Sequence, residues 1–462
     1  MKVLDEIKPA HNAPIPEAAT RNACKVCSPL GAAMVFKGIQ GCLPFLHGSQ
    51  GCATYIRRYM ISHFREPVDI ASSSFSEDDA IFGGARNFEI GIDNVIQQYN
   101  PEVIGVATTC LSETIGDHMI GMIKDYQENH KTDGPPLVHV STPAYTGTHS
   151  DGYREAIKAV AQHFAKPCKH KKPYLINVLP PMASCADLRY LREICRLYGL
   201  VPVMLPDYSS TLEGESWDQY NRISPGGTPV GRLEQMGSAS GTLEIGHQPA
   251  YAKESAGAWL ESAHRVRKET AGWPIGIRQS DHLMTSLSML SGRTMPKEVE
   301  AERGRLVDAY VDGHKYISGK TAVVFGEPDL VISMAAFLSE IGIRPIICAT
   351  GSKVKKWSEM LAPEIEDGVK DIHCMSGVDH AKIKAKIAEL KPDLMVGSSK
   401  GFPISKEFNI PLLRVGFPIH DRFGAQRQLT MGYRGTQILF DQIVNMMMEV
   451  KQTRSEVGYS YI

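Results

Sequence analysis

Long apolar runs and net charge are both missing from the 462-residue sequence. No stretch reaches the roughly 18 consecutive apolar residues that indicate a membrane-spanning helix. Residues 1–27 hold acidic side chains but no apolar core, so they do not resemble a secretory signal, and we expect a cytoplasmic protein. The formal net charge of −1 predicts no bulk attraction to nucleic acid or to an anionic membrane surface.

Several short motifs are also absent or incomplete. The chain has no Walker A motif, so we expect another protein to bind and hydrolyse ATP. Cys24 and Cys27 form a C-x-x-C pair, but a zinc ribbon needs a second such pair, which is lacking. A thioredoxin-like redox pair is disfavoured too, because only a weak βαβ pattern follows directly. Ten cysteines in a large chain without a secretory signal do not indicate a disulfide framework.

Short apolar strands alternate with amphipathic helices along most of the chain. "PEVIGVATTC" and "PYLINVLPP" are typical of buried strands, and "CADLRYLREICRLYGL" has helical spacing. This alternation predicts an α/β protein with three Rossmann-like domains and mostly parallel sheets, which bind ligands beyond the carboxyl ends of their strands. Composition predicts an N-terminal arm at 1–19, α/β domains at 20–165, 172–310 and 318–440, and a C-terminal helix and tail at 441–462.

Three cysteines lie where loops are expected. Cys27 precedes "SPLGAA", Cys52 ends "GSQGC", and Cys110 follows a predicted strand in "ATTCLSETIGD". Thiolates select soft metals, so one interpretation is a shared zinc, copper(I) or iron–sulfur group. The other interpretation is three unrelated cysteines. The scattered remaining cysteines are interpreted as free core or surface thiols: Cys168, Cys185, Cys195, Cys348 and Cys374.

Four longer stretches make a family resemblance specific. "CSPLGA", "CLPFLHGSQGCATYIRRYMISHFREP", "SSSFSEDDAIFGG" and "TTCLSETIGD" closely resemble the β-type subunit of nitrogenase component 1. That family includes catalytic K-type chains, N-type cofactor-assembly chains, and nitrogenase-like reductases such as methylthio-alkane reductase. The intervals between Cys27, Cys52 and Cys110 are similar to the family's spacing, and "VGFPIHDR" and "GYRGTQILFDQI" match near the C-terminus. The resemblance covers nearly the whole chain.

The resemblance implies both partners and a cofactor. It implies an α-type (D- or E-like) partner, with the αβ pair doubled to an α2β2 heterotetramer. At the αβ contact it implies an iron–sulfur cluster, of the eight-iron P-cluster type or a four-iron species, with Cys27, Cys52 and Cys110 as this chain's metal ligands. An ATP-hydrolysing iron protein would dock over this contact and deliver electrons. The catalytic cofactor would lie in the partner, so no catalytic residue is expected in this chain.

The same resemblance implies residues around the cluster and at the docking face. Ser49 would donate a hydrogen bond near the cluster, and Gly51 would let the backbone approach it. Tyr55, three residues past Cys52, would lie on the same helical face, either toward the cofactor side or as a core aromatic. Phe82 in "IFGG" matches an exposed aromatic of the family's docking face, whereas its context alone indicates a core residue.

Several positions carry separate expectations. Ala144 stands where catalytic β chains often carry a serine that adds an oxygen ligand to the oxidised P-cluster, so that ligand exchange is not expected here. His118 replaces part of the family's usual acidic pair. Cys24 resembles N-type chains of anaerobes and nitrogenase-like reductases, and we interpret it as a free thiol. His47, before the glycine turn, is expected to hydrogen-bond to the backbone.

Two functions remain open from the sequence. One is the K-like subunit of an ATP-dependent nitrogenase-like oxidoreductase, whose α-type partner reduces dinitrogen in nitrogen fixation or cleaves a carbon–sulfur bond. The other is an N-type scaffold for iron–molybdenum cofactor biosynthesis, and Cys110, which many N-type chains lack, favours the first. A tetrapyrrole reductase of the dark-operative protochlorophyllide type ranks last, because its B chains lack the long block from "HGSQGC" to "HFREP".

Overall fold

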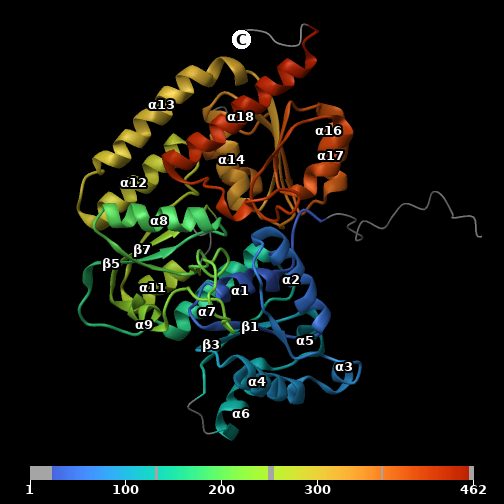
Figure 1. Ribbon diagram of the computed structural model, residues 1–462, viewed down its shortest axis with the longest axis vertical. Coiled ribbons are helices and arrows are strands. Elements are labelled where there is room, and N and C mark those ends of the chain that lie inside the picture. The colour runs from blue at the N-terminus through green and yellow to red at the C-terminus, as the bar shows by residue number, and fades with distance from the viewer. Residues whose placement is uncertain (1–22, 131–133, 248–253, 366–367, 457–462) are drawn as a thin grey trace, which may run out of the picture.

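Three parallel sheets, each covered by helices, form the skeleton of the molecule (Figure 1). The computed structural model describes residues 23–130, 134–247, 254–365 and 368–456. The predicted arm at 1–19 and the end of the predicted C-terminal tail therefore lie outside the described residues. The predicted α/β class with parallel sheets is confirmed, because every strand pair among the described residues is parallel.

The first sheet has the strand order β2-β1-β3-β4 and lies toward the lower end of the view in Figure 1. Its central strands, β1 (Cys42–His47) and β3 (Val103–Thr108), are buried at every residue, as parallel strands covered on both faces are. The other elements of this unit are β2 (Ala71–Ser72), β4 (Leu137–Val140), α1 (Ser28–Lys37), α2 (Gln50–Phe64), α3 (Asp79–Phe82), α4 (Ala85–Tyr99), α5 (Cys110–Ile115), α6 (Met119–His130) and α7 (His149–Phe164).

The second sheet has the order β6-β5-β7-β8. After its first strand, α8 (Cys185–Leu197) begins with a capping box, in which Ser184 and Asp187 each bond the other's backbone N–H. The strands are β5 (Lys172–Leu179), β6 (Val201–Met204), β7 (Ala239–Ile245) and β8 (Arg267–Ala271). The further helices are α9 (Val230–Leu233), α11 (Ala256–His264), α12 (Ile277–Ser291) and α13 (Lys297–Ile317).

The third sheet has the order β11-β10-β9-β12-β13. Its strands are β9 (Thr321–Gly326), β10 (Arg344–Thr350), β11 (His373–Ser376), β12 (Leu394–Gly397) and β13 (Leu412–Arg414). Its helices are α14 (Pro328–Glu340), α15 (Trp357–Leu361), α16 (His380–Leu390), α17 (Phe402–Phe408) and α18 (Gly432–Arg454). The long helix α18 packs along α13 of the second unit (Figure 1). The exact division into domains stays a prediction.

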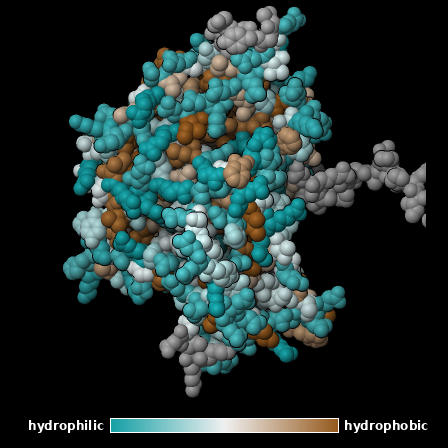
Figure 2. Space-filling model, viewed as in Figure 1, coloured by the Kyte–Doolittle hydropathy of each residue, from teal (hydrophilic) through white to brown (hydrophobic). Residues whose placement is uncertain are grey.

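One large hydrophobic core joins the three units. Buried residues of α1, α8 and α14, such as Met34, Leu188 and Met334, belong to the same apolar cluster. On the face shown in Figure 2, hydrophilic residues prevail, and hydrophobic residues gather around α14 and α18. In the described part of the chain, no helix is long and apolar enough to cross a membrane.

Candidate metal centre

Two neighbouring strands bring Cys52 and Cys110 to the same edge of the first sheet. β1 and β3 pair in parallel, with His47 opposite Thr108 at their carboxyl ends. Cys52 follows in the first turn of α2, and Cys110 is the first residue of α5. Because parallel strands end at the same edge, this pairing places both thiols where α/β sheets bind ligands.

Cys27 reaches the same region at the start of α1. It is the N-cap residue of this helix, which packs on β1 and β3. Because α1 connects to β1 through a short turn, the helix runs back along the strand, and its N-terminal end lies near the strand's carboxyl edge. Burial raises the pKa of the Cys27 thiol, and the nearby thiolates of Cys110 and Cys52 raise this pKa further. The three thiols are therefore close neighbours.

The three thiols lie on an open face of the chain. Cys27 and Cys110 are exposed, and Cys52 is half-buried. Neighbouring thiolates repel one another, so a bound cation would stabilise their charged forms. The N-terminal ends of α1 and α2 add partial positive charge beside Cys27 and Cys52. Among the described residues, no group of three or more histidine, cysteine or acidic side chains could hold a single metal ion, so the thiols do not form a closed one-ion site.

Polar hydrogens point at two of the sulfurs. The backbone N–H of Ala144 donates to Cys110 Sγ at 3.2 Å. Ser49 Oγ donates to Cys52 Sγ over a longer distance of 3.9 Å. Hydrogen bonds to thiolate sulfurs are one of the levers that set the potential of an iron–sulfur cluster. The soft thiolate donors and these polar hydrogens together fit such a cluster.

Two glycines beside the thiols have different reasons for lacking a side chain. A Cβ at Gly51 would meet only Ser49 Oγ, at 3.8 Å, so open space surrounds this position. A Cβ at Gly48 would lie 2.1 Å from Thr109 Oγ1. Thr109 also donates its N–H and its hydroxyl to the carbonyl of His47, at 3.2 and 3.1 Å. The turns after β1 and β3 therefore pack tightly against each other, and this packing positions Cys52 and Cys110, which follow them.

Tyr55 and Phe82 both lie at the surface. The Tyr55 side chain is 48% exposed, and its hydroxyl lies 2.9 Å from that of Tyr59. Phe82, the last residue of α3, is 84% exposed, and the neighbouring Ile81 is 75% exposed. The core interpretation is therefore wrong for both predicted residues, since each side chain is accessible to a partner.

Two expectations about local structure need correction. Cys27 lies in the loop directly before α1, as expected, but Cys52 and Cys110 lie in the first turns of α2 and α5 and not in loops. The ring of His47 does not bond to the backbone. Its Nε2 lies 2.9 Å from Asp117 Oδ2, with both side chains buried, and burial lowers the pKa of His47. The same carboxylate accepts the N–H of Gly84, two residues after the exposed Phe82.

The other cysteines remain free in the structure. Cys24 is buried, and burial raises the pKa of its thiol to about 12, so this thiol stays protonated at neutral pH. The five scattered cysteines also form no disulfide: Cys185, Cys195 and Cys348 are buried, Cys374 is half-buried and Cys168 is exposed. Lys400, whose charge lowers the pKa of Cys27, was missed by the sequence analysis, because a single lysine in "GSSKGFP" has no distinguishing pattern.

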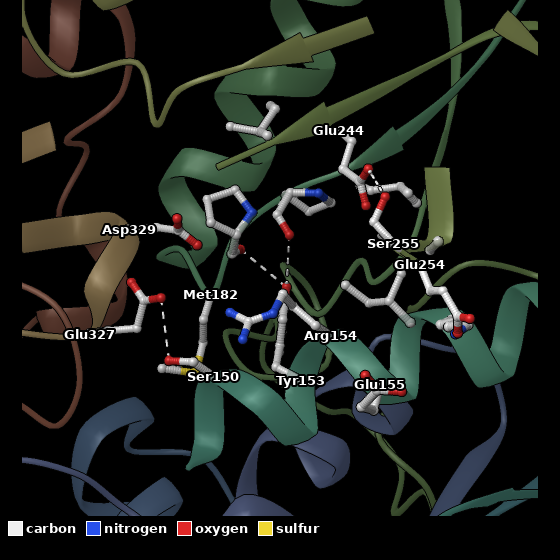
Figure 3. Close-up of a pocket in the computed structure, with 17 residues that line it drawn as sticks. Ser150, Tyr153, Arg154, Glu155, Met182, Glu244, Glu254, Ser255, Glu327 and Asp329 are labelled. Atoms are coloured by element: carbon white, nitrogen blue, oxygen red, sulfur yellow. Dashed lines mark hydrogen bonds and ion pairs between the residues drawn. The ribbon is translucent and has the colours of Figure 1, made fainter. Parts of the chain in front are cut away.

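A separate small cavity lies where α7, the carboxyl ends of β5 and β7, and the start of α14 meet (Figure 3). Ser150 Oγ donates to Glu327 Oε1 at 3.3 Å, and Ser255 Oγ donates to Glu244 Oε2 at 2.6 Å. These carboxylates already occupy the N-terminal ends of α14 and α11. The cavity of about 70 Å³ is far below the roughly 300–1,000 Å³ of typical small-molecule pockets, so we assign it no ligand.

Comparisons with known proteins address the family of this chain. Residues 27–448 match the family model described as nitrogenase component 1 type oxidoreductase. The chain is 33% identical to the nitrogenase molybdenum-iron protein beta chain of Clostridium pasteurianum, over 93% of each chain. It is 34% identical to the protein of that name from Methanococcus maripaludis, over 93% of this chain and 95% of the other.

Solved structures show the same fold. A chain of nitrogenase Cp1 at pH 6.5 superposes with a TM-score of 0.92 and 31% identity, and the match covers 98% of both chains. A chain of nitrogenase Cp1 at pH 5, 16% identical with a TM-score of 0.68, shares the fold over 96% of this chain and 92% of its own. The chain therefore belongs to the nitrogenase component 1 type oxidoreductase family and, within it, to the β-type chains.

Proposed function

We propose that this chain is the K-like subunit of a nitrogenase-like two-component reductase, with Cys27, Cys52 and Cys110 as its ligands to an iron–sulfur cluster. The observation that supports this proposal is the gathering of the three thiols at one edge of the first sheet. Cys27 and Cys110 are exposed in the single chain. Exposed ligands suit a cluster whose remaining ligands come from a second, α-type chain.

The chain's own residues would bind the cluster and stabilise its charge. When bound, the cluster supplies an electron relay of the P-cluster type or a four-iron equivalent. The three thiolates would hold iron, and the hydrogen bonds from Ala144 and Ser49 would stabilise negative charge on sulfur. The α-type partner would cover the exposed thiols and exclude water, and Tyr55 would lie at the rim of this contact.

The partners and the substrate are part of the same proposal. We infer an α2β2 heterotetramer whose α-type subunits hold the catalytic cofactor. An ATP-hydrolysing iron protein would dock on the face that carries Phe82 and deliver electrons. The relatives are named nitrogenase molybdenum-iron protein beta chains, which supports dinitrogen as a substrate. Ala144, in place of the family's frequent serine, favours a related reductase, such as one that cleaves a carbon–sulfur bond.

Replacing one ligand tests the cluster assignment. In the complex with the native α-type partner, Cys52→Ala is expected to lose the cluster at the αβ contact, because one of three thiolates is removed. Iron content and the electron paramagnetic resonance spectrum of the reduced complex would be measured. Cys168→Ala is the matched control, because Cys168 is also a free, exposed thiol but lies in the link before β5, a strand of the second sheet. An unchanged iron content and an unchanged spectrum in Cys52→Ala would contradict the assignment of Cys52 as a cluster ligand.

A scaffold for iron–molybdenum cofactor biosynthesis is the alternative. The presence of Cys110 favours the relay, because many N-type chains lack this cysteine. Anaerobic turnover decides between the two functions: the complex would be mixed with its iron protein, ATP and reductant. ATP-dependent formation of hydrogen, ammonia, thiol or hydrocarbon identifies a reductase and its substrate. Intact clusters without such flux would identify the scaffold.

A further inference from the structure

Lys400 links the third sheet to the segment that leads into Cys27. It lies in the short 3-10 helix Ser399–Gly401, directly after β12. Its Nζ donates hydrogen bonds to the backbone carbonyls of Ala23 at 3.1 Å and of Lys25 at 3.2 Å. A side chain from the last third of the sequence therefore holds the backbone on the N-terminal side of a proposed cluster ligand.

The same segment is held from other directions. Val26 donates its N–H to His149 Nδ1 at 3.3 Å, and His149 donates its own N–H to the Val26 carbonyl at 3.1 Å. Ala23 forms an isolated antiparallel bridge with Asp379. Residues 23–26 are thus held by contacts from α7 and from the third unit, and Lys400 supplies the charged contact among them. Cys27 follows this segment directly and caps α1.

Lys400 also places positive charge beside Cys27. Its Nζ lies 3.2 Å from the carbonyl oxygen of Lys25, two residues before Cys27, and 5.3 Å from the centre of the Tyr59 ring. A cation in this position would act on any anionic group that Cys27 binds, through a medium less polar than water.

We propose that Lys400 is a positioning residue that seats Cys27 and, through its positive charge, favours the reduced form of a cluster bound there. The inference rests on the proposed function, because it takes Cys27 as a cluster ligand. Reduction by a mediator dye adds one electron to the cluster and breaks no bond, so the site becomes more negative by one charge. An ammonium nearby stabilises that added charge, and its removal disfavours reduction.

A redox titration of the complete complex with its α-type partner tests this inference. Dithionite and mediator dyes would set the potential, and cluster absorption and electron paramagnetic resonance would report the reduced fraction. At the potential where the wild-type cluster is half reduced, we expect the ratio of reduced to oxidised cluster in Lys400→Met to fall about tenfold, which is about 59 mV for one electron. Lys400→Arg, which keeps the charge, is expected to stay close to the wild-type ratio.

Hydrogen exchange gives a second readout, for the seating role. Peptides from residues 23–35 are expected to exchange faster in Lys400→Met than in the wild type, because two hydrogen bonds to their backbone are lost. Lys384→Met is the matched control, since it removes a charge from α16 of the same unit, where Lys384 pairs with Glu407 at 2.8 Å. If Lys400→Met does not fold, Lys400→Gln keeps a neutral N–H donor for the carbonyls.

The outcomes separate this inference from the proposed function. A wild-type ratio and wild-type exchange in Lys400→Met would overturn the role of Lys400 while the cluster assignment stands. An equal potential shift in Lys384→Met would overturn it as well, because net charge would then explain the effect. A wild-type complex without any cluster at the αβ contact would instead contradict the proposed function.

Discussion

His63 shows how one buried side chain makes the stability of this chain depend on pH. It lies in α2, where its Nδ1 accepts the backbone N–H of Ile419 at 2.9 Å and its ring meets Phe417. Burial lowers the pKa of His63 to about 3. In the unfolded chain the pKa of a histidine is about 6.5. At a pH between these two pKa values, His63 is therefore protonated in the unfolded chain but neutral in the folded chain.

The sign of the effect follows from this difference. The contribution of His63 to stability is fully present above pH 6.5 and is lost as the pH falls toward 3, by up to about 1.4 kcal/mol per pH unit. The amide oxygen of Asn can still accept the Ile419 N–H. In His63→Asn, we therefore expect the free energy of unfolding to decrease less steeply than in the wild type as the pH is lowered. Urea unfolding of the full chain between pH 7 and pH 5 measures these slopes.

An exposed histidine serves as the control for this experiment. His118 lies at the surface before α6, so His118→Asn is expected to keep the wild-type slope. Identical slopes for the wild type and His63→Asn would show that His63 is not the group that resists protonation.

At the scale of elements, the contact between α1 and α7 positions the Cys27 end of the site. A Cβ at Gly31 would lie 1.9 Å from the carbonyl oxygen of His149, and a Cβ at Gly152 would lie 2.0 Å from that of Ser28. The two helices therefore touch backbone to backbone, and only glycine permits this approach. Because Cys27 caps α1, the depth of this contact decides where its thiol lies.

Gly31→Ala is expected to push α1 away from α7. The free energy of unfolding should fall by about 1–3 kcal/mol, the usual cost of overpacking, since the obstructing atoms are backbone. The proposed cluster should also bind with lower occupancy, because Cys27 moves with the helix. Urea unfolding and iron content per complex measure the two effects.

Gly304→Ala is the opposite control. Gly304 lies within α13, and a Cβ there would meet nothing within 4 Å. Alanine is the better helix former, so the same substitution should raise the free energy of unfolding by about 0.5–1 kcal/mol and leave iron content unchanged. A Gly31→Ala chain as stable as the wild type would contradict the backbone-to-backbone contact.

At the scale of the whole molecule, the surface near Phe82 is the proposed docking site of the iron protein. Truncating an aromatic anchor of an interface costs about 2 kcal/mol or more, so Phe82→Ala should raise the half-saturating concentration of iron protein about thirtyfold. Iron content should not change, because Phe82 contacts no proposed ligand. Substrate turnover titrated with iron protein measures this.

Phe423 offers a matched comparison, because it is 81% exposed, close to the 84% of Phe82, and stacks on Arg427 in another unit of the fold. Phe423→Ala should leave the half-saturating concentration unchanged. An equal change of the half-saturating concentration in both variants, or no change in Phe82→Ala, would contradict a docking face on the first unit.

Local residue patterns were enough to predict the class of fold, the family and the three thiols of the candidate site. These depend on local patterns: apolar runs such as "PEVIGVATTC" are typical of buried strands, and the long stretches around Cys52 and Cys110 carry a resemblance that no short motif could. Burial of single aromatics was less predictable. Tyr55 and Phe82 are exposed, although an aromatic side chain in an apolar context is also typical of a core.

The surroundings of the thiols depend on how the three units pack together. The pairing of β1 with β3 sets Thr109 against Gly48, and the third unit brings Lys400 to the backbone beside Cys27. For the same reason, the ring of His47 forms a hydrogen bond with Asp117 and not with the neighbouring backbone. Such contacts join residues that are distant along the chain and form only when the units pack. No local pattern of residue types could therefore have predicted them.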